Sequence, residues 1–471
     1  MNICLLNDSF PPVIDGVANV MMNYADYLIR DHGASVLVGT PRYPDADYRK
    51  FAYPVIAYPS IDTAALTNGY RTGNPFDGKA LDEMAAFSPD LIHSHCPASA
   101  TVIARLLREK TKAPVIFTYH TKYDIDIRRV LHAKLAAQET IAAMVGNIEA
   151  CDEVWTVSRG AGESLQALGF RGETRVMHNG VDFRKGRVPQ SAVQEATRGY
   201  DLPEGVPVFL YVGRMMTYKN LPLILDALQL LSAQGKDFRM VFIGKGPDRE
   251  LLEGRAKELG LTGTGTGPDK CIFTGPVYDR DVLRAWNSRA DLFLFPSTFD
   301  TNGLVVREAA ACGLASVLVK GSCAAEDVTD GRNGFTIQET PEAMAELLGQ
   351  VCGDPGYLRE VGDRAMDELY LSWKDCVAQA YERYQVVLDQ WRSGKMPARK
   401  QQPTDCLVRL TAKTMEQSGQ IRNLRRELFR DVRETAAGMM ENIQETEEAA
   451  AHFLEQITGD LRKNLPHRRK E

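Results

Sequence analysis

The sequence predicts an α/β protein with two doubly wound domains in series, followed by a helical extension. Two observations predict this fold class: short apolar runs alternate with longer amphipathic stretches, and the alternation starts again near the middle of the chain. The chain of 471 residues is also too long for one core of ordinary size. Apolar strands separated by helices are typical of a parallel sheet covered on both faces.

The first domain is predicted over residues 1–186. Its short apolar runs are predicted to be strands, at residues 2–6, 35–38, 90–93, 114–119 and 153–157. Amphipathic stretches with helical spacing lie between them, for example over residues 17–30 and 99–110. This alternation predicts a Rossmann-like unit with a parallel sheet.

The second domain is predicted over residues 187–392, and the seam is expected in a polar stretch near residues 181–207. The strand-like runs of this half are residues 206–212, 238–243, 271–273, 291–295 and 315–319. Two doubly wound units in series face each other across a cleft at the carboxyl ends of their strands. We therefore expect ligands to bind on loops that follow strands.

The composition changes at Ser393, and residues 393–471 are predicted to be a linker and a helical tail. Apolar residues of the tail recur at spacings of three and four for much of its length, from Ile421 to Leu461. Two interpretations stay open. The helix packs on the body or pairs in a coiled coil, which would give a homodimer, or it binds a membrane surface or a partner.

The bulk composition excludes several classes of protein. A formal charge of −6 argues against a protein built mainly to hold nucleic acid. Nine cysteines without a CxxC pair indicate reduced thiols, with neither a disulfide framework nor a zinc site. The first residues lack the pattern of a signal peptide, and no window has the ~18 apolar residues of a membrane span. We expect a cytoplasmic protein, for which peripheral contact with the inner face of the membrane stays open.

Three residues of the first domain are candidates for a site. Gly16 ends the first strand-to-helix loop, where backbone N–H groups at a helix start can approach a phosphate, although a plain turn glycine fits equally well. His120 follows an apolar strand and is predicted to point into the cleft, whereas a lone histidine is more often structural. Asp124 orients His120 or the substrate, or is a solvated loop charge.

The second domain opens with a pair of cations. Arg214 and Lys219 lie just past its first strand, where two positive charges suit a departing diphosphate. Gly244 and Lys245 form a tight turn, which is either a connector or a wall of a nucleotide site. Backbone groups around Val277 are candidates for reading the edge of a base.

The segment from residue 291 to 319 gives the strongest signal. Asp300 and Glu308 flank the start of a helix, and the Glu308 carboxylate can accept hydrogen bonds from sugar or ribose hydroxyls. An acidic helix cap with a surface glutamate is the alternative. The backbone N–H groups that could hold a diphosphate belong to Asn302, Gly303, Leu304 and Val305.

These motifs together carry a resemblance to a known family. They are PPVIDGV, TYHTKYD, HNGVD, VGRMMTYKN, GKGP, FTGPV and EAAACG. Over about residues 1–392 the chain resembles the retaining glycosyltransferases of the GT-B architecture, in particular family four, the glycosyl transferases group 1. The resemblance implies transfer of a hexose from a nucleotide-sugar to an acceptor hydroxyl. It also implies no metal in the donor site, no further cofactor and no side-chain nucleophile.

The resemblance also implies roles for individual residues. The position of Gly16 contacts the donor phosphate, and that of His120 lies at the transferred sugar. Arg214 and Lys219 match the residues that bind the diphosphate, and Glu308 matches the residue that holds the ribose.

The chain departs from the family pattern at two positions. Asp300 stands where the family usually has glutamate near the sugar hydroxyls, and it reaches about one methylene less far. It therefore favours another sugar or acts through a water. Asp15 and Gly16 replace a pair of glycines.

With the strings TYHTKYDIDIRR and STFDTNGLVVREAA, the chain resembles the branch of this family that glucosylates diacylglycerol or related lipids. For such an acceptor, basic residues next to the cleft would touch anionic headgroups, although a solvated basic face is an equally good interpretation. These residues are Arg128, Arg129, His132 and Lys134. UDP-glucose is the favoured donor, ahead of GDP-mannose and UDP-N-acetylglucosamine.

Other functions on the same fold stay open. A nucleotide-sugar epimerase or hydrolase would use the donor without an acceptor, and product analysis separates it from a transferase. A catalytically inactive scaffold that binds the sugar nucleotide is compatible with Asp300 but disfavoured by the intact cations and Glu308. A two-lobed solute-binding protein would normally carry an export signal.

Overall fold

The computed structural model describes residues 1–13, 15–63, 70–131, 133–263, 269–397, 402, 404–415 and 417, without the side chains of Asp126 and Arg129. Residues Met1–Val408 form one compact unit, and Arg409–Glu471 form a second. The apolar positions from Ile421 to Leu461, on which the coiled-coil and homodimer predictions depend, lie outside the described residues.

The first domain contains a seven-stranded sheet in the order β3-β2-β1-β6-β7-β8-β9, with every pair of neighbours parallel. The strands are β1 (Asn2–Leu6), β2 (Ser35–Pro41), β3 (Val55–Tyr58), β6 (Leu91–Ser94), β7 (Val115–Tyr119), β8 (Glu153–Thr156) and β9 (Arg175–Val176). A short antiparallel pair, β4 (Ser60–Asp62) and β5 (Arg71–Gly73), is separate from this sheet. All five strands predicted for this domain are confirmed, and β3 and β9 add to them.

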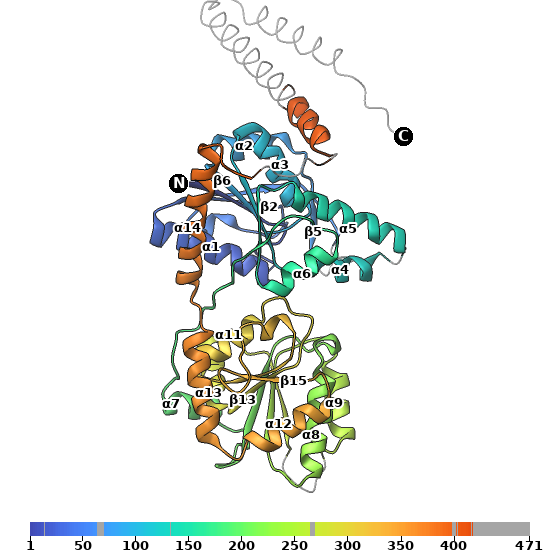
Figure 1. The fold of residues 1–471 in the computed structure, drawn as a ribbon, viewed down its shortest axis with the longest axis vertical. Helices are drawn as coiled ribbons and strands as arrows, with labels where there is room; N and C mark the ends of the chain where they lie inside the picture. The colour runs from blue at the N-terminus through green and yellow to red at the C-terminus, as the bar shows by residue number, and fades with distance from the viewer. Residues whose placement is uncertain are drawn as a thin grey trace, which may run out of the picture. The chain divides into compact units, whose positions relative to one another are not determined.

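Helices lie around this sheet, as predicted (Figure 1). They are α1 (Gly16–His32), α2 (Gly78–Ala86), α3 (Ser99–Thr111), α4 (Tyr123–Val130), α5 (Lys134–Glu149) and α6 (Arg159–Ala167). Helix α1 begins where Asp15 caps it, since the Asp15 carboxylate accepts a 2.7 Å hydrogen bond from the Ala18 N–H. Its buried face packs on the apolar strands.

The second domain contains a six-stranded parallel sheet in the order β12-β11-β10-β13-β14-β15. Its strands are β10 (Val208–Val212), β11 (Arg239–Ile243), β12 (Cys271–Gly275), β13 (Leu292–Phe295), β14 (Ser316–Val319) and β15 (Phe335–Ile337). Its helices are α7 (Gln190–Ala196), α8 (Leu221–Ala233), α9 (Arg249–Glu258), α10 (Arg280–Arg289), α11 (Leu304–Ala311), α12 (Pro341–Val351) and α13 (Pro355–Glu368). The prediction of two Rossmann-like domains is confirmed.

Both sheets have a point at which the strand order reverses. In the first sheet β1 lies between β2 and β6, and in the second β10 lies between β11 and β13. Ligands of open α/β sheets bind at the carboxyl ends of the strands at such points. His120, Lys219 and Asp300 follow β7, β10 and β13, and Gly16 begins the helix that follows β1, so the topology favours a site at these residues.

The last helix of the body, α14 (Trp373–Arg392), packs with a different domain from the one to which the sequence assigns it. The sequence groups it with residues 187–392, but its apolar face packs in the core of the first domain, where Trp373 and Tyr384 are buried beside α1. Arg383 also donates to both carboxylate oxygens of Glu153 on β8, at 2.9 and 2.5 Å. An amphipathic helix at the end of a chain can cover either core, and sequence order does not decide between them.

The segment after α14 is anchored to the first domain. Arg105 of α3 is buried, and its Nη2 donates to Asp405 Oδ1 at 2.9 Å and to Thr404 Oγ1 at 2.8 Å. Its Nη1 donates to Asn147 Oδ1 at 2.6 Å. The polar run predicted as a linker therefore ends at a buried ion pair, and helical structure begins at Thr404. None of the described helices is long and apolar enough to cross a membrane.

Candidate donor and acceptor site

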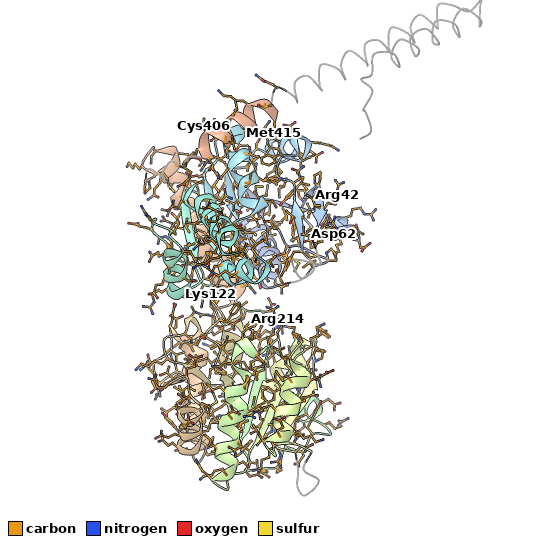
Figure 2. All side chains as sticks on the ribbon, turned by 90° about the vertical axis from the view of Figure 1, so that its right-hand side faces the viewer. Arg42, Asp62, Lys122, Arg214, Cys406 and Met415 are labelled. Atoms are coloured by element: carbon orange, nitrogen blue, oxygen red, sulfur yellow. The ribbon has the colours of Figure 1, made fainter. Side chains whose placement is uncertain are left out.

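Loops of the two domains meet where the strands end. The Thr301 hydroxyl donates to the backbone carbonyl of His120, and Lys122 Nζ donates to the carbonyl of Thr298 at 3.0 Å. Lys122 and Arg214 both lie toward the junction of the two domains (Figure 2). The loop after β7 therefore contacts the loop after β13, as the prediction of a shared site requires.

Lys219 and Asp300 form the most enclosed charged pair of this region. Lys219 is 8% exposed, and its Nζ lies 2.9 and 3.1 Å from the two Asp300 oxygens. Ser297 Oγ donates to Asp300 Oδ2 at 2.5 Å, and the Phe295 ring lies 5.6 Å from the lysine ammonium. The short Asp300 side chain is thus held by Lys219 and Ser297, and the ammonium lies at the strand end where a diphosphate would be bound.

Arg214 is the second predicted cation, and its side chain makes no ion pair with any residue that the structure describes. Its carbonyl accepts a 3.0 Å hydrogen bond from the Tyr211 hydroxyl, which fixes the loop. Burial raises the pKa of Tyr70, and Arg214 opposes this shift, which places the guanidinium near Tyr70. Because the Tyr70 hydroxyl donates to Asp15 at 2.8 Å, Arg214 lies on the side of the site that holds the start of α1.

The start of α1 is only partly capped. Asp15 accepts hydrogen bonds from the Ala18 N–H and from Ser9 Oγ, at 2.7 and 3.0 Å. Apart from its chain neighbours and the backbone of its own helix, no described residue lies within 4 Å of the position that a Cβ at Gly16 would take, and neither Gly16 N–H nor Val17 N–H has a hydrogen bond among the described residues. The open space and the free N–H groups can accommodate an anion there.

The start of α11 is free of any side-chain cap. Gly303 precedes the helix with φ +58°, and a Cβ there would lie 2.9 Å from the Ala324 Cβ, so the position favours glycine. No hydrogen bond within the described chain reaches the N–H groups of Leu304 and Val305. The buried Asn302 Nδ2 is also without a partner among the described residues. These donors, at the positive end of the helix dipole, suit a phosphate.

Glu308 lies on α11 and is held by a residue that the sequence analysis did not predict. Arg280 Nη2 donates to Glu308 Oε1 at 2.5 Å and lies 3.8 Å from Asp182. Burial raises the pKa of Glu308, and Arg280 opposes this shift. The Arg280 guanidinium stacks 4.4 Å from the centre of the Phe183 ring. A ribose bound by Glu308 would therefore either share the Glu308 carboxylate with Arg280 or displace the Arg280 side chain from it.

The turn after β11 requires a glycine at position 244, because the backbone passes close to another loop there. Gly244 has φ +150°, and a Cβ there would lie 1.9 Å from the Gly213 carbonyl oxygen. Lys245 is exposed, with its ammonium 5.7 Å from the centre of the Tyr278 ring, and Tyr278 is 74% exposed. Val277 packs partly buried against the core of the second domain. The exposed Tyr278 ring beside Lys245 is a candidate surface on which a base could stack. The motif FTGPV did not predict this ring.

His120 is buried in a row of three histidines. Its Nε2 lies 2.9 Å from Nδ1 of His95, and the two rings stack with centroids 5.2 Å apart. His93 lies next in the row, with 2.6 and 2.7 Å contacts to the Tyr384 hydroxyl and Thr118 Oγ1. Burial lowers the pKa of His120 to about 3, so the ring is neutral at physiological pH. His93 and His95 were not predicted from the sequence, although their spacing of two at the end of a strand places both on one face.

The predicted acceptor residues lie on α4 and α5. Asp124 and Arg128 form an ion pair at 3.8 Å along α4, and Lys134 is exposed at the start of α5. The side chain of Arg129 and all of His132 lie outside the described residues. Three large apolar side chains of this corner are exposed: Ile125, Val130 and Leu135.

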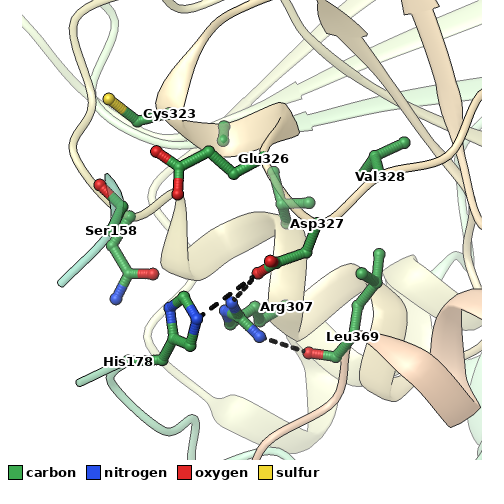
Figure 3. Close-up of a pocket in the computed structure, with 11 residues that line it drawn as sticks. Ser158, His178, Arg307, Cys323, Glu326, Asp327, Val328 and Leu369 are labelled. Carbon is green, nitrogen blue, oxygen red and sulfur yellow. Dashed lines mark hydrogen bonds and ion pairs between the residues drawn. The ribbon is translucent and has the colours of Figure 1, made fainter. Parts of the chain in front are cut away.

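A small polar pocket lies beside the site (Figure 3). His178 Nε2 lies 3.8 Å from Asp327 Oδ2, and Arg307 Nη2 donates to the same oxygen at 2.7 Å. Glu326 accepts hydrogen bonds from the N–H groups of Arg159 and Gly160 at the start of α6. The carboxylate of one domain thus caps a helix of the other. No group of three or more histidine, cysteine or acidic residues is placed to hold a metal ion within the described part of the chain.

Two models of known families match the chain, one in each domain. The model of "Glycosyltransferase Family 4" matches residues 14–185, and that of "Glycosyl transferases group 1" matches residues 193–367. Together the two matches cover about three quarters of the chain.

Individual proteins give a consistent result. The chain is 25% identical to an alpha-monoglucosyldiacylglycerol synthase of Streptococcus pneumoniae, over 66% of this chain and 70% of that protein. It is 25% identical to the sulfoquinovosyl transferase SQD2 of Arabidopsis thaliana, over 81% of this chain and 73% of that protein. The structure of HepE from Anabaena in complex with UDP-glucose superposes with a TM-score of 0.63 at 19% identity, over 82% of this chain and all of that one.

Proposed function

This chain belongs to the group 1 and family 4 glycosyltransferases of GT-B architecture, and we propose that it transfers glucose from UDP-glucose to a hydroxyl of a membrane lipid such as diacylglycerol, with retention of anomeric configuration. The enzyme class follows from the family. The observation that carries the proposal is that Lys219, Arg214 and the start of α11, which has no side-chain cap among the described residues, all follow the adjacent strands β10 and β13.

The reaction develops negative charge on the leaving diphosphate, and the proposed site supplies positive charge for it. The nearly buried Lys219 ammonium, the N–H groups at the start of α11 and the Arg214 guanidinium, which makes no ion pair with a described residue, act on this charge. Glu308 accepts hydrogen bonds from the ribose hydroxyls. These fixed groups need little reorganisation when the bond breaks, which is the main requirement for electrostatic stabilisation.

The transfer breaks the bond between the anomeric carbon and the β-phosphate oxygen and forms a bond to the acceptor oxygen. The acceptor proton passes to the departing diphosphate on the same face of the sugar, so no side-chain nucleophile is used. His120 lies beside the transferred sugar in this arrangement, next to the loop that carries Asp300.

We expect UDP-glucose to raise the thermal midpoint of the purified protein more than GDP-mannose or UDP-N-acetylglucosamine, because a ligand of the folded state stabilises it by mass action. Thermal-shift measurements with the three donors check this. Incubation with the stabilising donor and diacylglycerol vesicles should then give a glycolipid with an α linkage. Free sugar or an epimerised donor as the only product would favour a hydrolase or an epimerase, and binding without any product would favour an inactive scaffold.

The lipid acceptor is supported by the surface of α4 and α5 and by the name of the pneumococcal relative, which is a monoglucosyldiacylglycerol synthase. Exposed Arg128 and Lys134 lie among the exposed apolar side chains of the same corner. Basic residues interspersed with apolar ones suit an anionic bilayer surface, where each cation contributes roughly 1 kcal/mol.

Charge reversal at this corner should weaken membrane binding. The Arg128→Glu/Leu135→Glu double variant is expected to bind phosphatidylglycerol vesicles at least about tenfold more weakly, since it places two acidic groups against an anionic surface. Vesicle flotation measures the binding. Leu251→Glu is the matched control, because Leu251 is also exposed (62%) but lies on α9 of the second domain. Equal binding by the double variant and the control would count against membrane contact at α4 and α5.

A further inference from the structure

The buried contact between His95 and His120 has a direction that the surrounding structure determines. His95 follows β6 and His120 follows β7, so neighbouring parallel strands place the two rings side by side. The 2.9 Å contact joins Nδ1 of His95 to Nε2 of His120. The backbone at His95 is held as well, since its carbonyl accepts a 3.3 Å hydrogen bond from the Tyr123 hydroxyl.

Burial lowers the pKa of both rings, so each imidazole is neutral and carries one N–H. Two arrangements of the protons can make the contact. Either His95 donates from Nδ1, which leaves the proton of His120 on its Nδ1, or His120 donates from Nε2, which leaves the proton of His95 on its Nε2.

The far nitrogen of His95 decides between the two arrangements. His95 Nε2 is fully buried and has no hydrogen-bond partner among the described residues. If His120 were the donor, an N–H group would be buried there without an acceptor. If His95 is the donor, only a lone pair is left at that position. In protein backbones, buried N–H donors are left without a partner more rarely than carbonyl acceptors are, and we apply the same preference to the imidazole.

We propose that His95 is a positioning residue, which donates from Nδ1 to His120 Nε2 and thereby holds His120 as the tautomer that presents an Nδ1–H donor to the transferred sugar. This inference rests on the proposed function, because it needs the sugar to lie at His120. Nδ1 of His120 has no hydrogen bond to any described residue, and it is not among the fully enclosed polar atoms. It is therefore available to a ligand.

The tautomer matters because the opposite one would present a lone pair to the sugar. A sugar hydroxyl oxygen can accept a stronger hydrogen bond from an N–H in the transition state. With the opposite tautomer this oxygen would face the lone pair of His120 Nδ1, which cannot donate a hydrogen bond. His93 supplies a matched control, since it packs 4.0 Å from the His95 ring but makes its hydrogen bonds to Tyr384 and Thr118. Its replacement changes the packing of the row without removing the bond to His120.

The first experiment is nitrogen NMR of the full chain labelled with 15N-histidine, because N–H and lone-pair nitrogens of one ring have well-separated signals. The His120→Asn variant assigns the His120 signals. We expect the wild type to carry the His120 proton on Nδ1 and the His95→Leu variant to lose this preference. A His120 proton on Nε2 in the wild type would overturn the inference. This measurement uses no substrate, so the expected tautomer in a protein without transferase activity would contradict the proposed function alone.

The second experiment is steady-state kinetics with UDP-glucose. His95→Leu should lower kcat by about tenfold or more and leave the KM for the donor within about twofold, since the lost hydrogen bond acts on the transition state. His95→Asn, whose amide N–H stands near the place of Nδ1, should restore most of kcat. His93→Gln should keep kcat within about twofold, even if its thermal midpoint falls. If His95→Asn were as slow as His95→Leu, or His93→Gln were equally slow, the role of His95 would be one of packing and the proposal would be wrong.

Discussion

Replacing Lys219 with methionine is expected to lower kcat by about 10²- to 10³-fold. The ammonium is nearly buried and lies 2.9 Å from Asp300, at the end of the strand where the leaving diphosphate would be held. A charge in such a position is screened far less than one in water, so its loss removes a large part of the stabilisation of the transition state. Methionine retains the length and the apolar stem of the side chain. Initial rates at saturating donor measure the effect.

Two controls separate this effect from others. Lys257→Met removes an exposed cation of α9 that is not among the candidate site residues, and we expect it to change kcat by no more than about threefold. Lys219→Met also leaves the Asp300 carboxylate without its cation, so the Lys219→Met/Asp300→Asn double variant shows how much of the loss comes from that unpaired charge. A folded Lys219→Met enzyme with a kcat within threefold of the wild type would refute the assignment of Lys219 to the diphosphate.

The central strands of both sheets were predictable because they are buried on both faces and therefore uniformly apolar. Four of the five residues of β1 are apolar, the exception being Asn2, and β10 has the sequence VFLYV. The outer strands are harder to separate from loops, because β9 has only two residues, β15 has three, and most of β3 is only partly buried. The place of α14 was not predictable for a different reason, since its apolar face suits either core.

The arrangement of the candidate site residues was predictable where it follows from position along a strand. Lys219 and Asp300 come after the adjacent strands β10 and β13, and the structure brings their side chains together. Partners from other elements were not predictable. Arg280 reaches Glu308 from the start of another helix, and Glu326 caps α6 of the other domain. These contacts depend on how helices and domains pack against one another, and a local sequence pattern does not specify that packing.

Lowering the pH from 7.5 to 5.5 is expected to reduce the free energy of unfolding of the first domain by up to about 4 kcal/mol. Burial lowers the pKa values of His93, His95 and His120, the last to about 3. In the unfolded chain each has a pKa near 6.5. Between the two values the unfolded state binds more protons than the native state, so stability falls as the pH falls. Each histidine contributes about 1.4 kcal/mol over this interval.

Among the residues that the structure describes, no carboxylate contacts the three rings in a way that would hold an imidazolium. The side chains in contact with the row are aromatic or hydroxyl groups, with no carboxylate among the described ones: Tyr24, Thr118, Trp155 and Tyr384. Four carboxyls of the described chain act in the opposite direction. Burial raises the pKa values of Asp8, Asp26, Asp291 and Glu308, so their protonation favours the native state as the pH falls. Of the four, Asp8 and Asp26 lie in the first domain and reduce the observed loss.

Comparison with a variant that lacks one histidine isolates the effect of the row from that of the carboxyls. Urea unfolding at pH 7.5, 6.5 and 5.5, followed by hydrogen exchange in peptides from β6 and β7, reports the first domain separately from the second. The His93→Gln variant should lose about one third less stability over this interval than the wild type, whatever its stability at pH 7.5, because one proton-binding difference has been removed. An identical pH dependence in the two proteins would mean that His93 is protonated, or accessible to protons, in the native state. The buried neutral row, and with it the fixed tautomer of His120, would then have to be abandoned.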